Sequence, residues 1–410
     1  MTLDSVGELH HEFNPMVEPH RQDPHLFYDW ARRERPVAYS QSLQAWLVTR
    51  YADLKAIVSD PVTYSSAPAL PSVWANPAEV LEVLQGCIPE ANSMINADEP
   101  VHAPMRRVFN PAFTGRRVRE LKPAMLREAN RLIDSFIEAG RADVVAQYAA
   151  PFVRHVLSWA AGIPDDDIAS VHQWNEEFMK VMNPLLPVEI KVEAAKHYRP
   201  YEEYLSELLR SRAAEPRDDL ASYLINGGHG LPPLRFEDAL YLLRGSLSAG
   251  FDTTRDTIAS AVLKLMEHRA LWDASVDDDR TLRHVIEETL RAEAPHRGLM
   301  RVTTRAVTLG GEQLPKGARL LLLFGSGNRD EQHFPDPDLF DINRENVRDH
   351  LAFGDGIHRC PGAPMARQEV FVALQVLRSR LPQLQLASDY QPTYAASYFF
   401  RSPEQVLAVW

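Results

Sequence analysis

The sequence predicts a mainly α-helical protein with small β-sheets. Residues 235–268 are apolar around almost the whole helical circumference, and residues 114–214 carry one helical pattern after another. Runs of β-branched and aromatic residues that suit strands occur only towards the two ends of the chain. The 410 residues are 45% hydrophobic, which is enough for a large buried core. Because no linker-like tract, internal repeat or low-complexity segment interrupts the chain, we expect one domain over residues 1–410.

The first half of the chain begins with a predicted hairpin. Residues 37–50 alternate aromatic and β-branched positions around a polar turn, and residues 51–59 fit a short helix. Residues 66–97 hold several prolines that interrupt regular elements, so we expect irregular structure there. In 114–214 the helical spacing is clearest at Leu121, Met125, Ala129, Leu132 and Phe136.

The second half is organised around the long helix at 235–268, which would span roughly 50 Å at 1.5 Å per residue. A further helix is expected at 281–293, strands at 301–309 and 319–324, little regular structure at 325–359, a helix at 361–380 and short strands up to Trp410. The predicted β-rich part covers about 37–60, 299–324 and 384–410, and the predicted helical part covers about 98–293 and 361–380.

Composition narrows the class of protein. A net charge of −12 argues against a nucleic-acid-binding face and against docking on an anionic membrane. The first residues do not resemble a signal peptide, and the strongest apolar run, 320–324, is far too short to span a bilayer. The two cysteines do not form a disulfide framework. We therefore expect a cytoplasmic protein that is not embedded in a membrane.

One of these cysteines, Cys360, lies in a glycine-rich loop that runs from Phe353 to Arg367. Glycine allows close backbone approach to a flat ligand and unusual backbone angles. The helix that follows directs its N-terminus at Cys360, which favours a thiolate, and Pro361 suits its first turn. The alternative is a buried structural cysteine in a glycine-rich turn.

A second polar motif, Ala249-Gly-Phe-Asp-Thr-Thr254, interrupts the long apolar helix. The hydroxyl of Thr253 can donate to the carbonyl of Ala249, which bends a helix and opens a notch. Asp252 places an acid beside that hydroxyl, and two such groups together can pass protons to a bound molecule. The alternative is an ordinary back-bonded threonine with a capping-type aspartate.

The pattern Phe-Gly-x-Gly-x-His-x-Cys-x-Gly-x-x-x-Ala-Arg at 353–367 resembles the haem-binding loop of the cytochrome P450 superfamily. The motif at 249–254 is similar to the family's Ala-Gly-x-Asp-Thr-Thr signature, and Glu288-x-x-Arg291 is similar to its Glu-x-x-Arg helix. Arg359 departs mildly from the family pattern. Over about 98–367 the resemblance implies a single-domain cytochrome P450 fold of the bacterial type, with haem b between the long central helix and the Cys-loop helix.

The same resemblance implies roles for individual residues. Cys360 would be the axial ligand of the haem iron, Thr253 the oxygen-activating alcohol and Asp252 its acid partner. The residues expected to bind the haem propionates are His102, Arg106, Arg301 and His358. Those expected to lie against the haem are Phe353, Gly354, Ala249 and Gly250. Glu288, Arg291 and Arg344 would form a buried ion cluster that supports the Cys360 loop.

The family pattern also places an apolar, partly aromatic substrate pocket. The residues expected to line it are Trp74, Ile95, Phe178, Met182, Leu247, His296, Arg297, Leu299 and Phe399. For each of them the alternative is a plain core position. We further hypothesise that Arg297 or His296 anchors an acidic or phenolic group of the substrate.

The resemblance implies a haem-thiolate monooxygenase that inserts one atom of O₂ into a small or medium-sized, largely apolar substrate. We expect a monomer that receives electrons from NAD(P)H through a separate ferredoxin or flavodoxin with its reductase. The basic residues expected to meet that partner are Arg106, Arg107, Arg116, Arg117 and Arg119. The alternatives are a peroxide-driven peroxygenase and a haem-binding protein without turnover. A helical scaffold without haem would require three motifs to coincide by chance.

Overall fold

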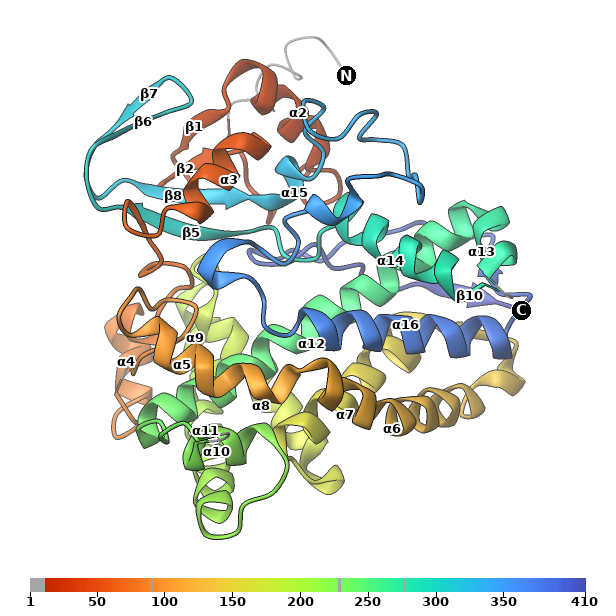
Figure 1. Cartoon of the computed structure of the whole chain (residues 1–410), viewed down its shortest axis with the longest axis horizontal. Coiled ribbons are helices and arrows are strands. Elements are labelled where there is room, and N and C mark those ends of the chain that lie inside the picture. Colours follow the sequence, from red (N-terminus) through yellow and green to blue (C-terminus); the bar gives the residue numbers. More distant parts are fainter. Residues whose placement is uncertain (1–11, 90, 228–229, 276–277) are drawn as a thin grey trace.

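A single long helix, α12 (Phe236–Glu267), runs through the middle of the structure, with helices packed along most of its length (Figure 1). The computed structural model describes residues 12–410 apart from 90, 228–229 and 276–277. Acidic Glu237 and Asp238 occupy the first turn of α12, where they complement the helix dipole. The buried residues on this helix surround its axis, which confirms the predicted central, buried helix.

The other helices confirm a mainly α protein. They are α2 (His25–Glu34), α3 (Tyr51–Ser59), α4 (Ala78–Val83), α5 (His102–Phe109), α6 (Gly115–Asp134), α7 (Ala150–Ala161), α8 (Ile168–Met182), α9 (Val188–Ala195), α10 (Tyr198–Ala214), α11 (Leu220–Asn226), α13 (Arg269–Ser275), α14 (Asp279–Ala292), α15 (Phe324–Gly327) and α16 (Ala363–Arg380).

Helix α16, which follows the Cys360 loop, packs against α6, α12 and α14. Its core-facing residues include Val370, Phe371, Ala373 and Leu374, all essentially buried. In Figure 1, α16 crosses the lower half of the structure close to α12. This packing fixes the direction in which the N-terminus of α16 points, and with it the position of Cys360.

The strands form three small sheets. They are β1 (Val37–Ser40), β2 (Ala45–Val48), β3 (Tyr64–Ser65), β4 (Arg141–Asp143), β5 (Gly298–Thr303), β6 (Val307–Leu309), β7 (Glu312–Leu314), β8 (Arg319–Leu323), β9 (Gln385–Leu386) and β10 (Leu407–Val409). The largest sheet has the order β1-β2-β8-β5-β3 and lies at the top of Figure 1. The β1–β2 pair confirms the predicted hairpin, and β2 continues into the sheet through a parallel pairing with β8.

The predicted elements differ from the structure in a few places. Apart from residue 90, which the structure does not describe, residues 66–97 are irregular as expected except for a 3₁₀ turn, Val73–Ala75, and the short helix α4. Helix α2 was not predicted, whereas α5 lies inside the predicted helical part at 98–293 without having been expected as a separate helix. Strand β4 was also missed, because it has three residues and exists through its antiparallel pairing with β10 at the end of the chain. Over the residues that the structure describes, no helix combines the length and apolar character that a bilayer crossing needs.

Candidate active site

The loop that carries Cys360 is closed by a backbone hydrogen bond: the N–H of Cys360 donates to the carbonyl of Phe353 over 2.8 Å. Gly354 and Gly356 have φ angles of +61° and +65°, a region that L side chains rarely adopt. A Cβ on Gly356 would also lie 2.2 Å from the carbonyl oxygen of Val58 in α3. The glycines therefore permit a tight loop that rests directly on α3.

The sulfur of Cys360 lies at the start of α16. The N–H groups of Gly362 and Ala363 and the guanidinium groups of Arg106 and Arg367 act to lower the pKa of the thiol, whereas burial raises it and dominates. The predicted influence of the helix N-terminus is therefore present, but burial outweighs it. A cleft of about 330 Å³ opens beside this cysteine and is lined in part by Arg106, Phe113, Arg359 and Arg367.

A buried ion cluster supports the segment before the loop. Arg291 Nη2 lies 2.8 Å from Glu288 Oε1, and Arg344 Nε lies 3.4 Å from the same oxygen. Arg291 also donates to the carbonyl of Asn328, whose side chain accepts from the N–H of Leu351. The cluster predicted from Glu288, Arg291 and Arg344 is confirmed, and it ties α14 to the chain just ahead of Phe353.

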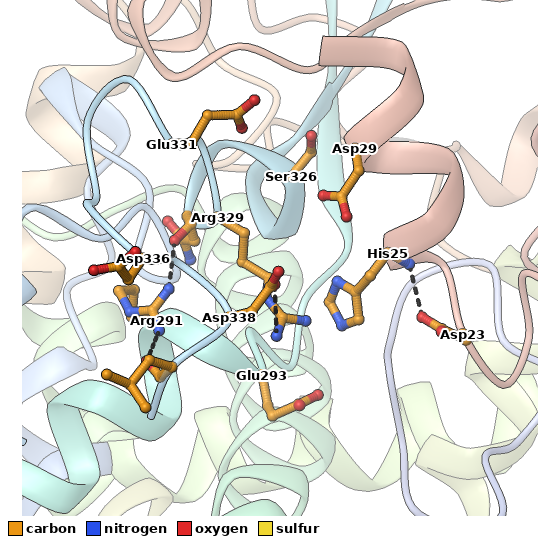
Figure 2. Close-up of polar contacts among 12 residues, drawn as sticks. Asp23, His25, Asp29, Arg291, Glu293, Ser326, Arg329, Glu331, Asp336 and Asp338 are labelled. Atoms are coloured by element: carbon orange, nitrogen blue, oxygen red, sulfur yellow. Dashed lines mark hydrogen bonds and ion pairs between the residues drawn. The ribbon is translucent and has the colours of Figure 1, made fainter. Parts of the chain in front are cut away.

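Further ion pairs surround this cluster. Arg329, the residue after Asn328, pairs with Asp338 at 3.3 Å, and Figure 2 shows both side chains in the region of Arg291. On α14, Glu287 accepts from Arg367 at 2.6 Å, and His350 approaches the same carboxylate.

Hydrogen bonds from His350 and Arg367 lower the pKa of Glu287 to about 2 despite its burial. The Arg367 guanidinium lies 4.4 Å from the centre of the Phe353 ring. Glu287 and His350 were not predicted as part of the site. Arg367, the last residue of the motif at 353–367, was the sequence feature that could have pointed to them, because it is the partner of Glu287.

The four residues predicted to hold haem propionates are brought together. The rings of His102 and His358 lie 4.3 Å apart, and within the described part of the chain neither Nε2 has a hydrogen-bond partner although both atoms are buried. Burial, with the nearby charges of Arg301, His102 and Arg106, lowers the pKa of His358 to about 3. Burial also lowers the pKa of Arg301 to about 10. Crowded, unsatisfied donors of this kind fit a ligand that carries carboxylates.

The middle of α12 presents one open face. Gly245 and Ala249 are exposed and Thr253 is half-buried, in a helix whose neighbouring positions are mostly buried. Because these residues are four apart, they share one side of the helix. The hydroxyl of Thr253 donates to the carbonyl of Ala249 over 2.8 Å, which confirms the predicted back-bond. A flat apolar cofactor fits against such a face.

Gly250 lies where α12 packs against α7. A Cβ at this position would lie 2.6 Å from Cδ2 of Leu157 on α7. The glycine therefore allows close packing of α12 on α7. One position along a helix turns a side chain by about 100°, so Gly250 cannot share the face of Ala249.

Asp252 is not an isolated acid. Arg255 Nη1 lies 2.7 Å from its carboxylate, and Arg255 Nη2 lies 2.8 Å from Asp256. The hydroxyl of Ser402 donates to the other oxygen of Asp256 over 2.5 Å. Burial raises the pKa of Asp256 to about 7, although Arg255 opposes that shift. Arg255 is therefore a direct partner of Asp252.

The residues expected around the substrate differ in solvent exposure. Trp74, Ile95, Met182, His296 and Leu299 retain accessible surface, whereas Leu247, Phe178, Arg297 and Phe399 are buried among protein atoms. Leu247 has no exposed surface, so it belongs to the core of α12 rather than to its open face. Trp74 donates its indole N–H to the hydroxyl of Tyr241 over 2.9 Å, which joins the 66–97 segment to α12.

His296 and Arg297 differ in exposure and in hydrogen-bond partners. Over residues 291–300, only His296 and Leu299 keep partial exposure. Burial lowers the pKa of His296 to about 4, so its ring is neutral near pH 7. Arg297 instead donates through Nε to the carbonyls of Ser397 and Phe400. It is 4% exposed and lines a small internal cavity with His25 and Tyr28.

Comparisons with known proteins agree with this geometry. A sequence profile of the family described as Cytochrome P450 matches residues 280–381. The chain is 34% identical over 370 residues to cyclomarin C epoxidase CymV of Salinispora arenicola, covering 88% of this chain and 90% of that protein. It is 33% identical over 403 residues to nocardicin C N-oxygenase of Nocardia uniformis, covering 97% and 98% of the two chains.

Among solved structures, full-length CYP116B46 of Tepidiphilus thermophilus superimposes with a TM-score of 0.90 and 30% identity. The match covers 99% of this chain and 54% of that longer chain.

Proposed function

Because the chain belongs to the cytochrome P450 family and is a cytochrome P450 monooxygenase, we propose that it inserts one atom of O₂ into a small or medium-sized, largely apolar organic substrate. The observation that carries the proposal is that two features of the site lie on neighbouring helices. A cysteine sulfur at the N-terminus of α16 and the open Ala249–Thr253 face of α12 belong to helices that pack on one another. We also propose that the chain is a single domain, because one hydrophobic cluster includes residues from Val73 to Ala408.

Cys360 would hold the haem iron, and His102, Arg106, Arg301 and His358 would hold the propionates. The support is that Nε2 of His102 and Nε2 of His358 are buried and lack partners among the described residues, with the charges of Arg301 and Arg106 close to His358. When bound, haem supplies the activation of dioxygen, and the thiolate donates electron density that favours O–O cleavage. The ion clusters at Glu287 and Glu288 would keep the cysteine loop in place during this chemistry.

Thr253 and Asp252 would hold and move the protons that the reaction consumes. The Thr253 hydroxyl is oriented by its bond to the carbonyl of Ala249, so its oxygen remains available as an acceptor. Asp252 is half-buried at 24% side-chain exposure, which lets its carboxylate exchange protons with water. This pair favours the O₂-dependent route over a peroxide-driven one.

His296 and Leu299 would contact the substrate, with Trp74, Ile95 and Met182 completing an apolar wall. The imidazole of His296 is neutral near pH 7, and its Nδ1 accepts from the N–H of Gly298, so its Nε2–H is the donor that it offers, without charge. It therefore suits a hydroxyl, phenol or carbonyl group better than a carboxylate. Arg297 donates through Nε to two backbone carbonyls, while its buried Nη1 and Nη2 have no hydrogen-bond partner among the described residues. Because Arg297 is buried and His296 keeps partial exposure, we propose His296 as the anchor.

Electrons from NAD(P)H would arrive through a separate ferredoxin or flavodoxin. The cleft beside Cys360 is bordered by Arg106, Arg359 and Arg367, which would attract an acidic partner. The basic patch expected further along the chain is partly neutralised, because Arg117 pairs with Asp218 and Arg116 with Glu120. Arg359 is the exposed arginine of the cleft lining, and Arg107 is exposed on α5 one position after Arg106.

The test is an absorption spectrum of the purified protein, reduced with dithionite and exposed to CO. A strongly red-shifted Soret band is expected, and Cys360→Ala should abolish it. The matched control is Cys87→Ala, which removes the other, buried cysteine and should leave the band in place. A band typical of a neutral axial ligand would overturn the thiolate assignment.

A second measurement separates the remaining alternatives. Product formation with NAD(P)H, a ferredoxin and its reductase supports the proposed route, and Thr253→Ala should divert consumed O₂ to peroxide. Turnover with hydrogen peroxide alone would instead identify a peroxygenase. A normal CO spectrum without product in either system, across a panel of apolar substrates, would favour a haem-binding protein without turnover.

A further inference from the structure

The feature that carries the inference is a chain of polar contacts that leaves the oxygen groove and reaches the C-terminal turn. Arg255 lies between two carboxylates on its own helix, 2.7 Å from Asp252 and 2.8 Å from Asp256. Its planar fork of N–H donors can bond both at once, which a lysine ammonium does less well. The Arg255 side chain is 24% exposed, whereas that of Asp256 is 1% exposed.

The far end of this chain is Ser402. Its hydroxyl donates to Asp256 over 2.5 Å and also lies 3.4 Å from Arg255 Nη2. Asp256 and Ser402 are 146 residues apart, so this contact depends on the fold and not on local sequence. A displacement of Ser402 would change how the guanidinium is shared between Asp256 and Asp252.

Ser402 belongs to a turn that pairs with the segment around His296. The N–H of Arg401 donates to the carbonyl of Pro295, the N–H of Arg297 donates to that of Phe399, and His296 forms a β-bridge with Phe400. The rings of His296 and Phe400 lie 5.4 Å apart. The turn that supplies Ser402 is therefore bonded to the residue proposed to touch the substrate.

Other charged groups near this chain come from α8 and α7. The negative charge of Glu176 on α8 helps to raise the pKa of Arg255. The direct partner of Glu176 is Arg154 of α7, at 2.8 Å. His172 of α8 lies 3.8 Å from Glu176, and its ring lies 3.7 Å from that of Phe251. Because Arg154 is the direct partner of Glu176, Arg255 is left to the two aspartates.

We propose that Arg255 is a positioning residue for Asp252: it holds the Asp252 carboxylate beside Thr253 and, through Asp256 and Ser402, links it to the turn that borders the substrate site. Contact of a substrate with this turn thereby affects the acid that delivers protons. The inference rests on the proposed role of Asp252. A contiguous network of polar contacts is the physical basis for such an energetic link between the turn and Asp252.

The first experiment compares substrate binding with coupling of NAD(P)H to product. In Arg255→Ala, the substrate dissociation constant from the haem spectral shift should stay within about twofold, while product per NAD(P)H falls at least about fivefold. Arg255→Lys, which keeps the charge but loses the fork, should recover part of the loss. Ser402→Ala should act in the same direction with a smaller effect.

The matched control is Arg235→Ala, which removes another Arg–Asp pair at the same i,i+3 separation from the start of α12. It should leave coupling unchanged. The CO spectrum of each variant verifies an intact haem site. Unchanged coupling in Arg255→Ala overturns the proposal, and unchanged coupling in Ser402→Ala overturns the link to the turn.

The second experiment needs no turnover. A double-mutant cycle of Asp252→Asn and Ser402→Ala, followed by urea unfolding, should be non-additive by at least about threefold in the unfolding equilibrium constant. In the Arg255→Ala background the same cycle should become additive, because the shared partner is gone. Additivity in both backgrounds overturns the link.

The variants distinguish a failure of the proposed proton route through Asp252 from a failure of the positioning role of Arg255. If Asp252→Asn leaves coupling intact, the proposed proton route fails, while the unfolding cycle still reports on the contact chain. If Asp252→Asn lowers coupling and Arg255→Ala does not, only the positioning role of Arg255 fails.

Discussion

Glu288 and Arg291 form an ion pair with no exposed side-chain surface, with Arg291 Nη2 2.8 Å from Glu288 Oε1. A buried charge that loses its partner is costly, because the remaining charge keeps its desolvation penalty. Glu288 also accepts from Arg344 and from the N–H of Asp341, so one carboxylate organises several segments ahead of the cysteine loop.

The first prediction concerns this pair. Glu288→Ala should lower the free energy of unfolding by about 3–5 kcal/mol, measured by urea unfolding, because Arg291 would remain buried without its counter-charge. The control is Glu120→Ala, which removes an exposed partner of Arg116. That change should cost less than about 1 kcal/mol. Equal losses in the two variants would contradict the organising role of Glu288.

The second prediction compares two glycines in the cysteine loop. Gly354→Ala should cost about 1–2 kcal/mol of stability, since its φ of +61° disfavours a side chain while the nearest atom lies 3.9 Å from the added Cβ. Gly356→Ala meets the same conformational cost and also a clash with the carbonyl of Val58 at 2.2 Å.

The total cost of Gly356→Ala should therefore reach about 2–5 kcal/mol, together with weaker haem retention in the CO spectrum. Equal stability and equal haem content in the two variants would show that the contact with α3 does not constrain the loop.

The third prediction concerns pH. The folded-state pKa of Asp256 is raised from 3.8 to about 7, so the folded protein binds this proton more tightly than the unfolded chain. Its contribution to stability is present below pH 3.8 and is lost as pH rises towards 7. Relative to wild type, Asp256→Asn should gain about 4 kcal/mol in unfolding free energy over that interval, because each pKa unit corresponds to about 1.4 kcal/mol.

Glu287→Gln is the control with the opposite sign. The folded-state pKa of Glu287 is lowered to about 2, so its stabilising contribution is present above pH 4.5 and is lost as pH falls towards 2. Wild type should therefore gain stability over Glu287→Gln as pH rises from 2 to 4.5. Parallel pH profiles for wild type and Asp256→Asn would refute the raised pKa of Asp256.

The fourth prediction separates His296 from Arg297. His296→Ala should change substrate dissociation constants by at least about fivefold for hydroxylated or phenolic ligands, since it removes one hydrogen bond at the proposed site. Binding of these ligands should be insensitive to pH between about 5.5 and 8, because the pKa of His296 is near 4.

Arg297→Ala should instead destabilise the fold by about 1–3 kcal/mol, because the carbonyls of Ser397 and Phe400 lose their donor. Spectral titration and urea unfolding measure the two effects. The assignment is contradicted if Arg297→Ala weakens binding of charged ligands while leaving stability unchanged.

Patterns within a short stretch of chain predicted much of this molecule. The long helix was expected at 235–268 and lies at Phe236–Glu267, and the helix expected at 51–59 is Tyr51–Ser59. The Thr253–Ala249 bond and the Glu288–Arg291 pair were also predicted, because residues three or four apart on a helix share a face. These features depend on helical geometry and need no knowledge of distant segments.

Several features that depend on contacts between distant segments were not predicted. Strand β4 depends on pairing with β10, and Gly250 is explained by Leu157 on another helix. The carboxylate of Glu287 gathers His350 and Arg367 from later segments. None of these partners is marked by spacing along the chain, because their proximity results from burying apolar faces against one another.

The sequence by itself determined the class of the fold, the cysteine loop, the notched central helix and the residue types of the site, since each is written in local spacing and backbone preference. Only the tertiary structure decided the directions of side chains, Arg255 towards Asp252 and Ser402 and Arg297 towards backbone carbonyls, and the close approach of α12 to α7 at Gly250. The physical reason is that side-chain direction and charge state depend on burial and on partners contributed by remote segments, which exist only once the helices have packed.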